Sequence, residues 1–492
     1  MILDLAASRA QLTPERPAVW ADGVWHDYAQ LNRRATALAA RLYEAGVRAG
    51  DRVSIMASNH LAHIDAFLAT AKLGFIYSPL NYRLSEPELR AMGDYLEPRL
   101  LLFDEANVDK AAAAGRDSAL YSLTDYGDWL AGAGAAPQAP DLDPEDPQMI
   151  LFTGGTSGSP KGALLPYRQI FFNAVNTVMS WGLRADDCVI QATPCFHAAF
   201  NAFTTPLLHV GARVVLQQSF EPGEYLRLLH GERATIMFLV PTMFGMLARH
   251  EEFARTDLGS VRWAISGGAP CTEAVRSHFA GRGVPFRQGY GLTEAGVNCF
   301  SIEQETADVK PGSVGKPMLH AEAVIRSEDG SEVAAGETGE LTLRGRHVFS
   351  GYFRRPEATG EALRDGWLWT GDLARRDEDG DFFIAGRRKD MFISGGENIY
   401  PAEIENALSG HPAVAECAVI GVPDEGWGES GLAAVVLNDG SQVSDIELSE
   451  FLRGHLARYK VPKRFVFVDS LPKSAAGKVL GRELLSSVKE MQ

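Results

Sequence analysis

The chain has 492 residues, of which 46% are apolar and 22% are charged, a composition typical of a soluble globular protein with a large core. This length excludes a single ordinary domain, and we expect at least two domains. The net charge of −16 argues against nucleic acid and against an anionic membrane surface as partners.

The cysteines and the N-terminus indicate the cellular setting. The five cysteines are scattered and form no C-x-x-C pair, so the sequence predicts neither a disulfide framework nor a zinc site and favours a reducing compartment. The N-terminus has no basic start followed by an apolar core, and the apolar stretch 66–80 contains Lys72 and is too short to span a bilayer. We therefore expect a cytoplasmic protein without an integral membrane segment.

The first 150 residues alternate helical and strand patterns. Residues 28–47 and 59–73 carry apolar side chains at helical spacing, whereas 51–56 and 100–103 are short apolar runs typical of buried strands. The order strand, helix, strand predicts a right-handed crossover unit in a parallel sheet. Residues 131–147 are rich in Ala, Pro, Gly and Asp and are predicted to form a loop.

Short strands continue through the middle of the chain. Apolar or β-rich runs separated by helix-like segments occur at 149–152, 188–192, 213–216, 235–240 and 261–265. This alternation predicts a large α/β body.

The pattern of predicted secondary structure changes twice towards the end of the chain. Between 312 and 385, glycine-punctuated strands with Asp-Gly turn signals predict a smaller β-rich subdomain, with strands at 322–326, 339–344 and 381–385. Past Arg387 the pattern is compact and α+β. A helix is predicted to begin at Pro401, and a second one follows the capping-box spacing of Ser444 and Glu447. Strands are predicted between these helices at 415–422 and 432–437.

The most informative stretch is 152–162, Phe-Thr-Gly-Gly-Thr-Ser-Gly-Ser-Pro-Lys-Gly. Glycines let backbone N–H groups point inward, and the hydroxyls and Lys161 add donors and charge, so this run predicts a loop around a polyphosphate. It does not match the Walker spacing, because Pro160 precedes Lys161 and Gly162 follows it. A flexible linker is the alternative for such a composition, but the preceding apolar run favours a ligand loop at the carboxyl edge of a sheet.

Two later segments could complete a nucleotide site. The segment 266–270, Ser-Gly-Gly-Ala-Pro, follows a predicted strand, and its small residues would let a flat ring approach the backbone. The segment 288–294, Gln-Gly-Tyr-Gly-Leu-Thr-Glu, places an aromatic face between glycines and a carboxylate that could hold Mg²⁺ near phosphates. Each pattern also suits an ordinary turn, so neither decides the function alone.

Two further segments carry charged side chains after turns. Asp372, in Trp-Thr-Gly-Asp, could accept hydrogen bonds from two vicinal ribose hydroxyls, and Arg387 follows fifteen residues later. Lys478 follows the small-residue run 474–477 near the end of the chain. Thr-Gly-Asp is also a common turn, and a surface lysine is usually only solvated, so both segments gain meaning from their context.

Taken together and in this order, five motifs resemble the adenylate-forming superfamily, which contains acyl-CoA synthetases, adenylation domains of peptide synthetases and luciferase-like enzymes. The motifs lie at 153–162, 288–294, 352–372, 386–401 and 472–478. Within the superfamily, the segments that look most like acyl-CoA and aryl-CoA ligases are 351–359, 394–401 and 424–429.

The resemblance implies a set of nucleotide contacts. The β- and γ-phosphates of ATP would be held by the loop residues Thr153, Gly154, Gly155, Thr156, Ser157, Gly158 and Lys161. Adenine would lie against Tyr290, in a site formed with Gly267, Gly268, Ala269, Gln288, Gly289 and Gly291. The remaining contacts would be Asp372 and Arg387 to the ribose, Thr293 to the α-phosphate, and Thr156 and Glu294 to Mg²⁺.

One position departs from the superfamily pattern. Most relatives carry serine where this chain has Gly154, and Ser157 stands where threonine is common. The loss of one hydroxyl could weaken phosphate binding, but backbone donors and Lys161 remain, so we expect activity to persist.

The resemblance also implies two half-reactions. A carboxylate that attacks the α-phosphate brings two anions together, so the transition state needs fixed cations, which Lys478 and Mg²⁺ would supply. The thiol of CoA would then attack the acyl-adenylate after the small domain rotates about Asp390. Gly395 and Gly396 would line the tunnel for its pantetheine arm, where side chains would obstruct it.

The expected organisation follows from these roles. A large domain over 1–387 would bind ATP and the acid, and a small mobile α+β domain over 388–492 would carry the catalytic lysine and part of the CoA tunnel. The partners would be a carboxylic acid, ATP and CoA. The sequence does not fix the oligomeric state, and a homodimer is one expectation.

The acid-binding side rests on the segment 194–197, Pro-Cys-Phe-His, which resembles the segment whose histidine gates the acyl pocket in the superfamily. A histidine packed at a strand end is the alternative. The predicted pocket consists of His197, Ala199, Phe200, Val240, Phe244, Gly268 and Gly296. Because no Asp or Lys is placed to pair with an α-amino group or a second carboxylate, amino acids and dicarboxylates are disfavoured. An aromatic acid such as a hydroxycinnamate or benzoate, and a medium-chain fatty acid, fit equally well.

Our leading hypothesis is an ATP-dependent carboxylic acid:CoA ligase, which forms an acyl-adenylate and then a thioester and releases pyrophosphate and AMP. Within the enzyme class, the alternative is an enzyme that passes the acyl group to a carrier protein or an amine. A non-catalytic adenylate or acyl binder is disfavoured, because it would have no need of Lys478, Glu294 and Asp372 together.

Overall fold

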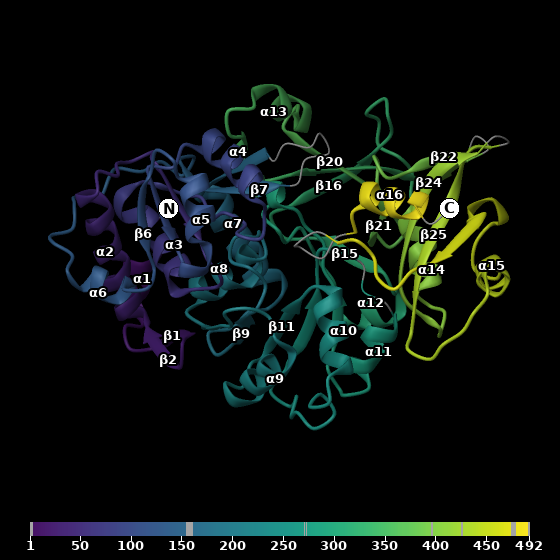
Figure 1. Cartoon of the computed structure of the whole chain (residues 1–492), viewed down its shortest axis with the longest axis horizontal. Coiled ribbons are helices and arrows are strands. Elements are labelled where there is room, and N and C mark those ends of the chain that lie inside the picture. Colours follow the sequence, from purple (N-terminus) through teal and green to yellow (C-terminus); the bar gives the residue numbers. More distant parts are fainter. Residues whose placement is uncertain are drawn as a thin grey trace.

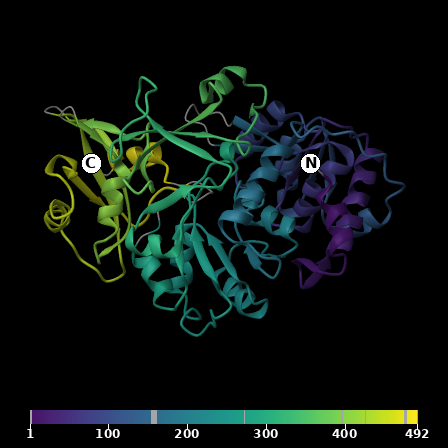
Figure 2. The ribbon, with the colours of Figure 1, turned by 180° about the vertical axis from the view of Figure 1, so that it is seen from behind.

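The computed structural model describes residues 3–153, 161–269, 271, 273–394, 397–424, 427–473 and 479–490. These residues form a mixed α/β protein in which a large N-terminal part adjoins a smaller C-terminal part (Figure 1), as the sequence predicts. Seen from behind, the green strands of the middle region lie between the purple N-terminal body and the yellow C-terminal part (Figure 2). The described residues contain four sheets.

The first sheet has seven strands in the order β13-β12-β11-β9-β10-β1-β2 and is parallel apart from the β1–β2 hairpin. Its strands are β1 (Pro17–Ala21), β2 (Val24–Asp27), β9 (Cys188–Gln191), β10 (Arg213–Leu216), β11 (Ile236–Leu239), β12 (Trp263–Ser266) and β13 (Phe286–Gln288). The helices between them are α8 (Phe200–Val210), α9 (Pro222–Gly231), α10 (Pro241–Arg249) and α11 (Glu273–Ala280). The structure confirms the four strands predicted in this region as β9 to β12. The β1–β2 hairpin was not predicted, and it joins the sheet through the distant parallel pair Val19 and Val214.

The second sheet also has seven strands, in the order β18-β8-β7-β4-β3-β5-β6. Its strands are β3 (Arg52–Met56), β4 (Ile76–Tyr77), β5 (Leu100–Phe103), β6 (Ala119–Ser122), β7 (Pro147–Thr153), β8 (Lys161–Pro166) and β18 (Gly351–Tyr352). The helices between them are α3 (Leu61–Leu73), α4 (Glu86–Leu96) and α5 (Val108–Ala114), with the short helix η1 (Glu105–Asn107). The two strands predicted near the N-terminus are confirmed as parallel neighbours, because Val53 of β3 pairs with Leu100 of β5.

The third sheet is antiparallel, with the order β14-β15-β21-β20-β17-β16 and β19 paired to β20. Its strands are β14 (Phe300–Ser301), β15 (Ser313–Pro317), β16 (Glu322–Arg326), β17 (Thr338–Arg344), β19 (Leu363–Arg364), β20 (Trp367–Arg376) and β21 (Phe382–Arg387). It is the predicted β-rich subdomain. One strand leaves it, since β18 pairs with β8 of the second sheet, and this connection was not predicted.

The C-terminal part contains the fourth sheet, in the order β23-β22-β25-β24 with β26 parallel to β25. Its elements are β22 (Phe392–Ser394), β23 (Glu397–Ile399), α14 (Pro401–Leu408), β24 (Val414–Asp424), β25 (Gly428–Leu437), α15 (Asp445–Arg453), η3 (Arg458–Lys460), β26 (Arg464–Phe467) and α16 (Gly481–Glu490). The predicted capping box is present before α15, where Ser444 and Glu447 bond reciprocally. Pro401 begins α14, as predicted.

The remaining helices pack around the large part. They are α1 (Leu5–Leu12), α2 (Tyr28–Glu44), α6 (Tyr126–Ala131), α7 (Tyr167–Ser180), η2 (Thr293–Ala295), α12 (Gln304–Val309) and α13 (Pro356–Ala362). Helix α2 shows how the sequence directs one of them. A capping box of Asp27 and Gln30 starts the helix, and its apolar face, with Leu31, Leu38 and Leu42, is buried as predicted.

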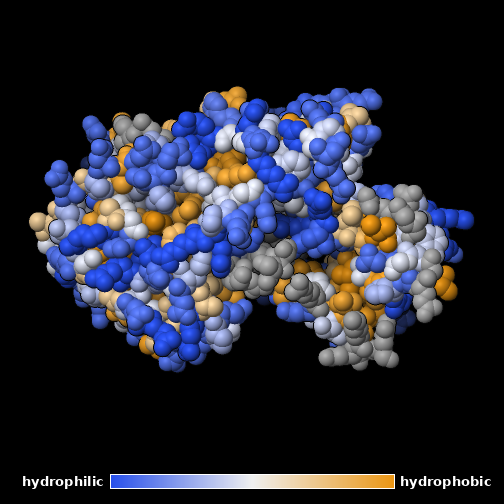
Figure 3. All heavy atoms as spheres, turned by 90° about the horizontal axis from the view of Figure 1, so that it is seen from above, coloured by the Kyte–Doolittle hydropathy of each residue, from blue (hydrophilic) through white to orange (hydrophobic). Residues whose placement is uncertain are grey.

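The surface of the protein is mostly hydrophilic, with scattered apolar patches, and it is indented between the large and the small part (Figure 3). In the part of the chain that the structure describes, no helix combines the length and the apolarity that crossing a bilayer requires.

Candidate active site

The residues predicted to bind a nucleotide come from loops and strands of three sheets. Strands β12 and β13 of the first sheet end at Ser266 and Gln288, and the loops that follow them carry the predicted adenine site. Strands β20 and β21 of the third sheet bring Asp372 and Arg387, and β8 of the second sheet begins at Lys161. The predicted site therefore forms where loops at the ends of parallel strands meet the antiparallel sheet.

Asp372 is held by two of its predicted neighbours. It is the cross-strand partner of Arg387, and its Oδ1 lies 3.0 Å from Arg387 Nε. Its Oδ2 accepts a hydrogen bond of 2.6 Å from the hydroxyl of Tyr290. The side chain is nearly buried, at 4% exposure, so the carboxylate is fixed before any ligand arrives. Such a group can accept hydrogen bonds from two vicinal hydroxyls.

The surroundings of Tyr290 and Arg387 keep the phenol neutral and the guanidinium charged. Burial, together with the carboxylate of Asp372, raises the pKa of Tyr290 well above its ordinary value, so the phenol stays a proton donor. Burial opposes the charge of Arg387, but Asp372, Tyr290 and Glu294 outweigh it, and the pKa of the guanidinium is raised. Arg387 therefore keeps its positive charge beside Asp372.

Glu294 and Lys161 are brought together by a tyrosine. Glu294 lies in η2 and is 9% exposed, and its Oε1 accepts a hydrogen bond of 2.8 Å from the hydroxyl of Tyr352. Lys161 Nζ lies 5.2 Å from the centroid of the same ring, within the range of a cation–π interaction. A carboxylate oxygen is the ligand type that Mg²⁺ prefers, so the donor set fits a metal-bound polyphosphate.

The two glycine-containing segments are tied to each other by Gln288. Its Nε2 donates to the carbonyl oxygens of Ser266 at 3.2 Å and Ala269 at 3.1 Å, and its Oε1 accepts from the backbone N–H of Cys271 at 3.0 Å. The N–H of Gly289 also donates to Ser266 O, at 2.8 Å. These bonds hold the two segments together in a wall of backbone groups joined by the Gln288 side chain.

The crowding around this wall explains why it needs small residues. A Cβ on Gly291 would lie 1.6 Å from the carbonyl oxygen of Val297, and a Cβ on Gly267 would lie 3.2 Å from the ring of Phe238. Val297 itself has φ +77°, a left-handed conformation that is strained for a β-branched residue. The backbone next to Tyr290 is thus held in a close-packed, partly strained arrangement.

Part of the predicted acyl pocket lies at the same edge of the first sheet. His197 Nδ1 accepts a hydrogen bond of 3.2 Å from the N–H of Ala199, just before Phe200 begins α8. The side chain of Val240 lies 3.8 Å from where a Cβ of Gly268 would be. The acyl and adenine segments therefore adjoin each other through this glycine.

Two other predicted pocket residues have different surroundings. Phe244 is fully buried and packs against Phe279 and Phe286, with ring centroids 5.1 and 4.9 Å away, inside a core cluster. Gly296 has φ +81°, and a Cβ there would lie 3.1 Å from the side chain of Asn173. The N–H of Phe244 donates to the carbonyl oxygen of Val240 at 3.2 Å, and Gly296 follows directly on Glu294 and Ala295.

Several predicted site residues lie outside the described residues. They are Gly154, Gly155, Thr156, Ser157 and Gly158 of the phosphate loop, Gly395 and Gly396 of the predicted CoA tunnel, and Lys478. The described neighbours frame the phosphate loop, since Thr153 ends β7 and pairs with Lys161 at the start of β8. Thr293 is described too, and its carbonyl oxygen accepts from Gln169 at 3.0 Å. The predicted hinge, Asp390, donates its N–H to Arg387 O at 3.0 Å.

Sequence reasoning missed two residues that organise the site. Tyr352 was recognised only as part of a motif, although its hydroxyl bonds Glu294. Glu340, on β17, accepts from the N–H of Gly371 at 3.0 Å and from Arg388 Nη1 at 3.1 Å, next to the predicted ribose residue and the predicted hinge. A glutamate within an apolar strand pattern was the available signal, because a charge buried there, as Glu340 is, needs partners.

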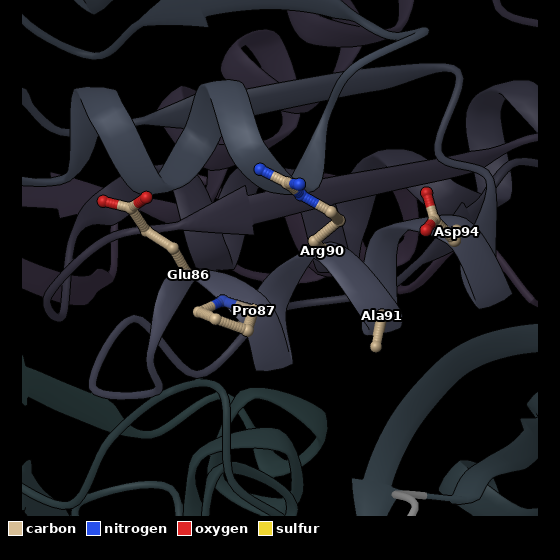
Figure 4. A pocket seen from close by; sticks show the side chains of 5 residues that line it. All are labelled: Glu86, Pro87, Arg90, Ala91 and Asp94. Atoms are coloured by element: carbon tan, nitrogen blue, oxygen red, sulfur yellow. The ribbon is translucent and has the colours of Figure 1, made fainter.

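A shallow cavity elsewhere on the surface is lined by side chains of α4, namely Glu86, Pro87, Arg90, Ala91 and Asp94 (Figure 4). Its charged members repeat every four residues with alternating sign along the helix. This spacing is typical of a solvated helix face, so the cavity adds nothing to the site.

An acidic hairpin turn joins β20 and β21. Asp377, Asp379 and Asp381 are the one group of acids in the described residues that is close enough to hold a metal ion. The ammonium of Lys310 lies 2.7, 2.7 and 2.6 Å from their oxygens and takes the centre of the group. The turn is therefore closed by an internal cation.

Comparisons with known proteins agree with this geometry. The profile of the AMP-binding enzymes matches residues 6–353, and the profile of the AMP-binding enzyme C-terminal domain matches residues 403–478. The chain belongs to the AMP-binding enzyme family. This finding confirms the resemblance inferred from the five motifs.

The AMP-binding enzymes that resemble the chain match it over nearly its whole length. A feruloyl-CoA synthase from an Amycolatopsis species is 41% identical over 479 residues, which are 97% of this chain and 96% of the relative. The crystal structure of ATP-bound MatB from Rhodopseudomonas palustris has a TM-score of 0.91 and 32% identity, with 100% of both chains covered. The structure of O-succinylbenzoate coenzyme A synthetase (MenE) from Bacillus subtilis in complex with ATP and magnesium ion has a TM-score of 0.89 and 31% identity, covering 98% of this chain and 99% of that one.

Proposed function

We propose that the protein is an ATP-dependent carboxylic acid:CoA ligase. The carboxylate attacks the α-phosphorus of ATP and displaces pyrophosphate, and the thiol of CoA then attacks the carbonyl of the acyl-adenylate and displaces AMP. The observation that carries this proposal is the joined arrangement of Tyr290, Asp372 and Arg387 beside Glu294 and Lys161. One site thus offers a ribose acceptor, two cations and a metal-binding carboxylate.

Each of these residues has a proposed task in binding ATP. Asp372 accepts from the ribose hydroxyls while Arg387 holds its carboxylate in place, and Tyr290 lies against adenine beside the backbone wall of 267–269. Lys161, at the end of the phosphate loop, binds the β- and γ-phosphates. Mg²⁺, when bound by Glu294, would neutralise charge that accumulates as pyrophosphate leaves.

The small domain completes the reaction in this proposal. We assign Lys478 to bridging the substrate carboxylate and the α-phosphate, because two anions must approach each other in the first step. The division into domains 1–387 and 388–492 places this lysine beyond a hinge at Asp390, so a rotation there would withdraw the lysine and admit the thiol past Gly395 and Gly396.

We infer that the acid is aromatic. The segments proposed for the acyl pocket, 197–200, 240–244 and 296–298, contain no Asp, Glu, Lys or Arg. Rings surround this edge of the sheet, with Phe203 and Phe238 5.1 Å apart, and Phe238 faces Gly267. The name of the relative that acts on a feruloyl group favours this class over medium-chain fatty acids. All five cysteines are free, which supports a reducing, cytoplasmic setting.

The decisive experiment measures AMP and acyl-CoA formed from ATP, Mg²⁺ and CoA with a panel of hydroxycinnamates, benzoates and straight-chain acids. We expect thioester from the aromatic acids, and a loss of adenylation by orders of magnitude in Lys478→Ala with retained fold. Pyrophosphate release without transfer to CoA would instead favour a carrier protein or an amine as the acceptor. No release with any acid would refute the ligase.

A further inference from the structure

We propose that Tyr352 is a positioning residue for adenylation, which holds Glu294 and Lys161 in the arrangement that metal-bound ATP requires. The inference rests on the proposed function and adds a residue to it that no motif role covers. Tyr352 contacts both charges through different parts of one side chain, with its hydroxyl 2.8 Å from Glu294 Oε1 and its ring centroid 5.2 Å from Lys161 Nζ.

The backbone around Tyr352 links the two elements that carry these charges. On one side, β18 pairs antiparallel with β8, with Tyr352 opposite Ala163, and the N–H of Phe353 donates to Gly162 O at 2.7 Å. On the other side, the N–H of Phe349 donates to the carbonyl oxygen of Glu294 at 2.8 Å. The segment 349–353 therefore joins the end of the phosphate loop to η2.

The tyrosine itself is fixed from behind by helix α13. Its N–H donates to Thr359 Oγ1 at 2.9 Å, and Thr359 in turn donates to Arg355 O at 2.9 Å. Gly351, with φ +129°, permits this approach, because a Cβ there would lie 2.5 Å from Thr359 Cγ2. The ring of Phe349 packs edge-on against the tyrosine ring at 4.9 Å. These contacts leave the phenol few orientations, which is what a positioning residue needs.

The chemistry of a phenol suits this position better than that of a charged donor. The hydroxyl of Tyr352 is an uncharged hydrogen-bond donor, and it donates to Glu294 Oε1 at 2.8 Å. A neutral donor fixes the plane of the Glu294 carboxylate without cancelling its charge. The π-face attracts the Lys161 ammonium without withdrawing its positive charge from a phosphate. An ion pair between Glu294 and Lys161 would neutralise both groups.

The test compares Tyr352→Phe with the wild type by isothermal titration of ATP at a series of Mg²⁺ concentrations, without an acid substrate. Removing one hydrogen bond to a charged group should raise the Mg²⁺ concentration for half-maximal ATP binding by about tenfold. Tyr352→Leu, which also removes the ring, should weaken ATP binding further, because Lys161 loses its contact. The first variant isolates the hydroxyl and the second adds the ring.

A matched control is available in the same chain. The hydroxyl of Tyr126 in α6 donates to Asp65 Oδ2 in α3 at 3.0 Å, a buried phenol–carboxylate hydrogen bond between elements that carry none of the predicted site residues. Tyr126→Phe should lower thermal stability and leave the Mg²⁺ dependence of ATP binding unchanged. If Tyr352→Phe unfolds, Thr359→Val is measured in its place, because it removes the hydroxyl that accepts from the Tyr352 N–H. Thr359→Val should also raise the Mg²⁺ concentration for half-maximal ATP binding, whereas Thr359→Ser should behave as the wild type.

Folded Tyr352→Phe with the Mg²⁺ dependence of the wild type would overturn the inference. This result differs from a failure of the proposed function, in which the wild type binds ATP with Mg²⁺ but forms no acyl-CoA from any acid of the panel. The titration does not depend on turnover, so the two failures are separable.

Discussion

The proposed ribose site offers a quantitative test of the nucleotide assignment. Asp372→Asn keeps the size of the side chain and one acceptor oxygen for the Tyr290 hydroxyl, but it removes the negative charge that faces Arg387 at 3.0 Å. A hydrogen bond to a charged group contributes about 1.5–3 kcal/mol, and a carboxylate that serves two vicinal hydroxyls makes two of them. The amide can replace one of these with a weaker, neutral bond. We therefore expect ATP binding to weaken by about 2–3 kcal/mol, or roughly 30- to 140-fold.

The assay is a double-mutant cycle in which one change is made in the protein and the other in the nucleotide. Dissociation constants are measured for ATP, 2′-deoxy-ATP and 3′-deoxy-ATP on the wild type and on Asp372→Asn, and the coupling free energy is the part of the loss that is not additive. If Asp372 accepts from the ribose, the variant should lose much less with a deoxynucleotide than with ATP.

The matched control is Asp187→Asn. Its carboxylate is 1% exposed and pairs with Arg262 at 2.6 Å, but it precedes β9 at the opposite, amino-terminal edge of the sheet. This variant should lose stability and keep its affinity for ATP. An equal loss for ATP and both deoxynucleotides in Asp372→Asn would refute the ribose assignment, because the effect would then be one of structure alone.

Three further predictions follow from single positions. Gly291→Ala places a methyl group against the Val297 carbonyl and should cost about 3 kcal/mol of stability, measured by urea unfolding, whereas Gly360→Ala, with nothing within 4 Å of its added Cβ, should cost nothing. Burial lowers the pKa of His63 from 6.5 to about 3. As the pH falls below 6.5, this histidine therefore binds a proton in the unfolded chain but not in the folded chain. The free energy of unfolding should therefore fall by about 2 kcal/mol between roughly pH 7.5 and 5. Unfolding curves at both pH values should show a smaller fall in His63→Gln. An equally large fall in the variant would show that His63 is not its cause. Lys310→Met leaves three aspartates facing one another without a cation, so the melting temperature of the variant should fall. Added Ca²⁺ should restore part of this loss. A melting temperature that does not change with Ca²⁺ would show that the turn cannot hold a metal.

Local signals were enough to predict much of the fold. The strands at Leu100–Phe103, Arg213–Leu216 and Glu322–Arg326 have the predicted bounds. Each is a short run of β-rich residues, and in the first two the apolar side chains are almost entirely buried. The start of α15 is likewise set by a local signal, since the capping box of Ser444 and Glu447 spans only four residues. Where the determinant of structure is this local, the sequence pattern is sufficient.

Long-range pairings were not predictable in the same way. Strand β1 joins the sheet by pairing Val19 with Val214, and nothing in either segment specifies the other. The site shows the same limit, since Tyr352 and Glu294 lie 58 residues apart and Tyr290 and Asp372 lie 82 apart. Residue types could suggest the members of the site, but only the packing of three sheets decides which side chains touch.

The β20–β21 hairpin also lies directly before the proposed hinge of the small domain. The N–H of Arg388 donates to Gly371 O at 2.9 Å, and its guanidinium pairs with Glu340, so the chain stays anchored to the large part until just before Asp390. Because Asp372 and Arg387 pair within this hairpin, a nucleotide bound at the proposed ribose site would stiffen the strands from which the proposed hinge extends. If both proposed roles hold, ATP binding and hinge rotation are thermodynamically linked, and a ligand that lacks a ribose would bind without this coupling to the C-terminal part.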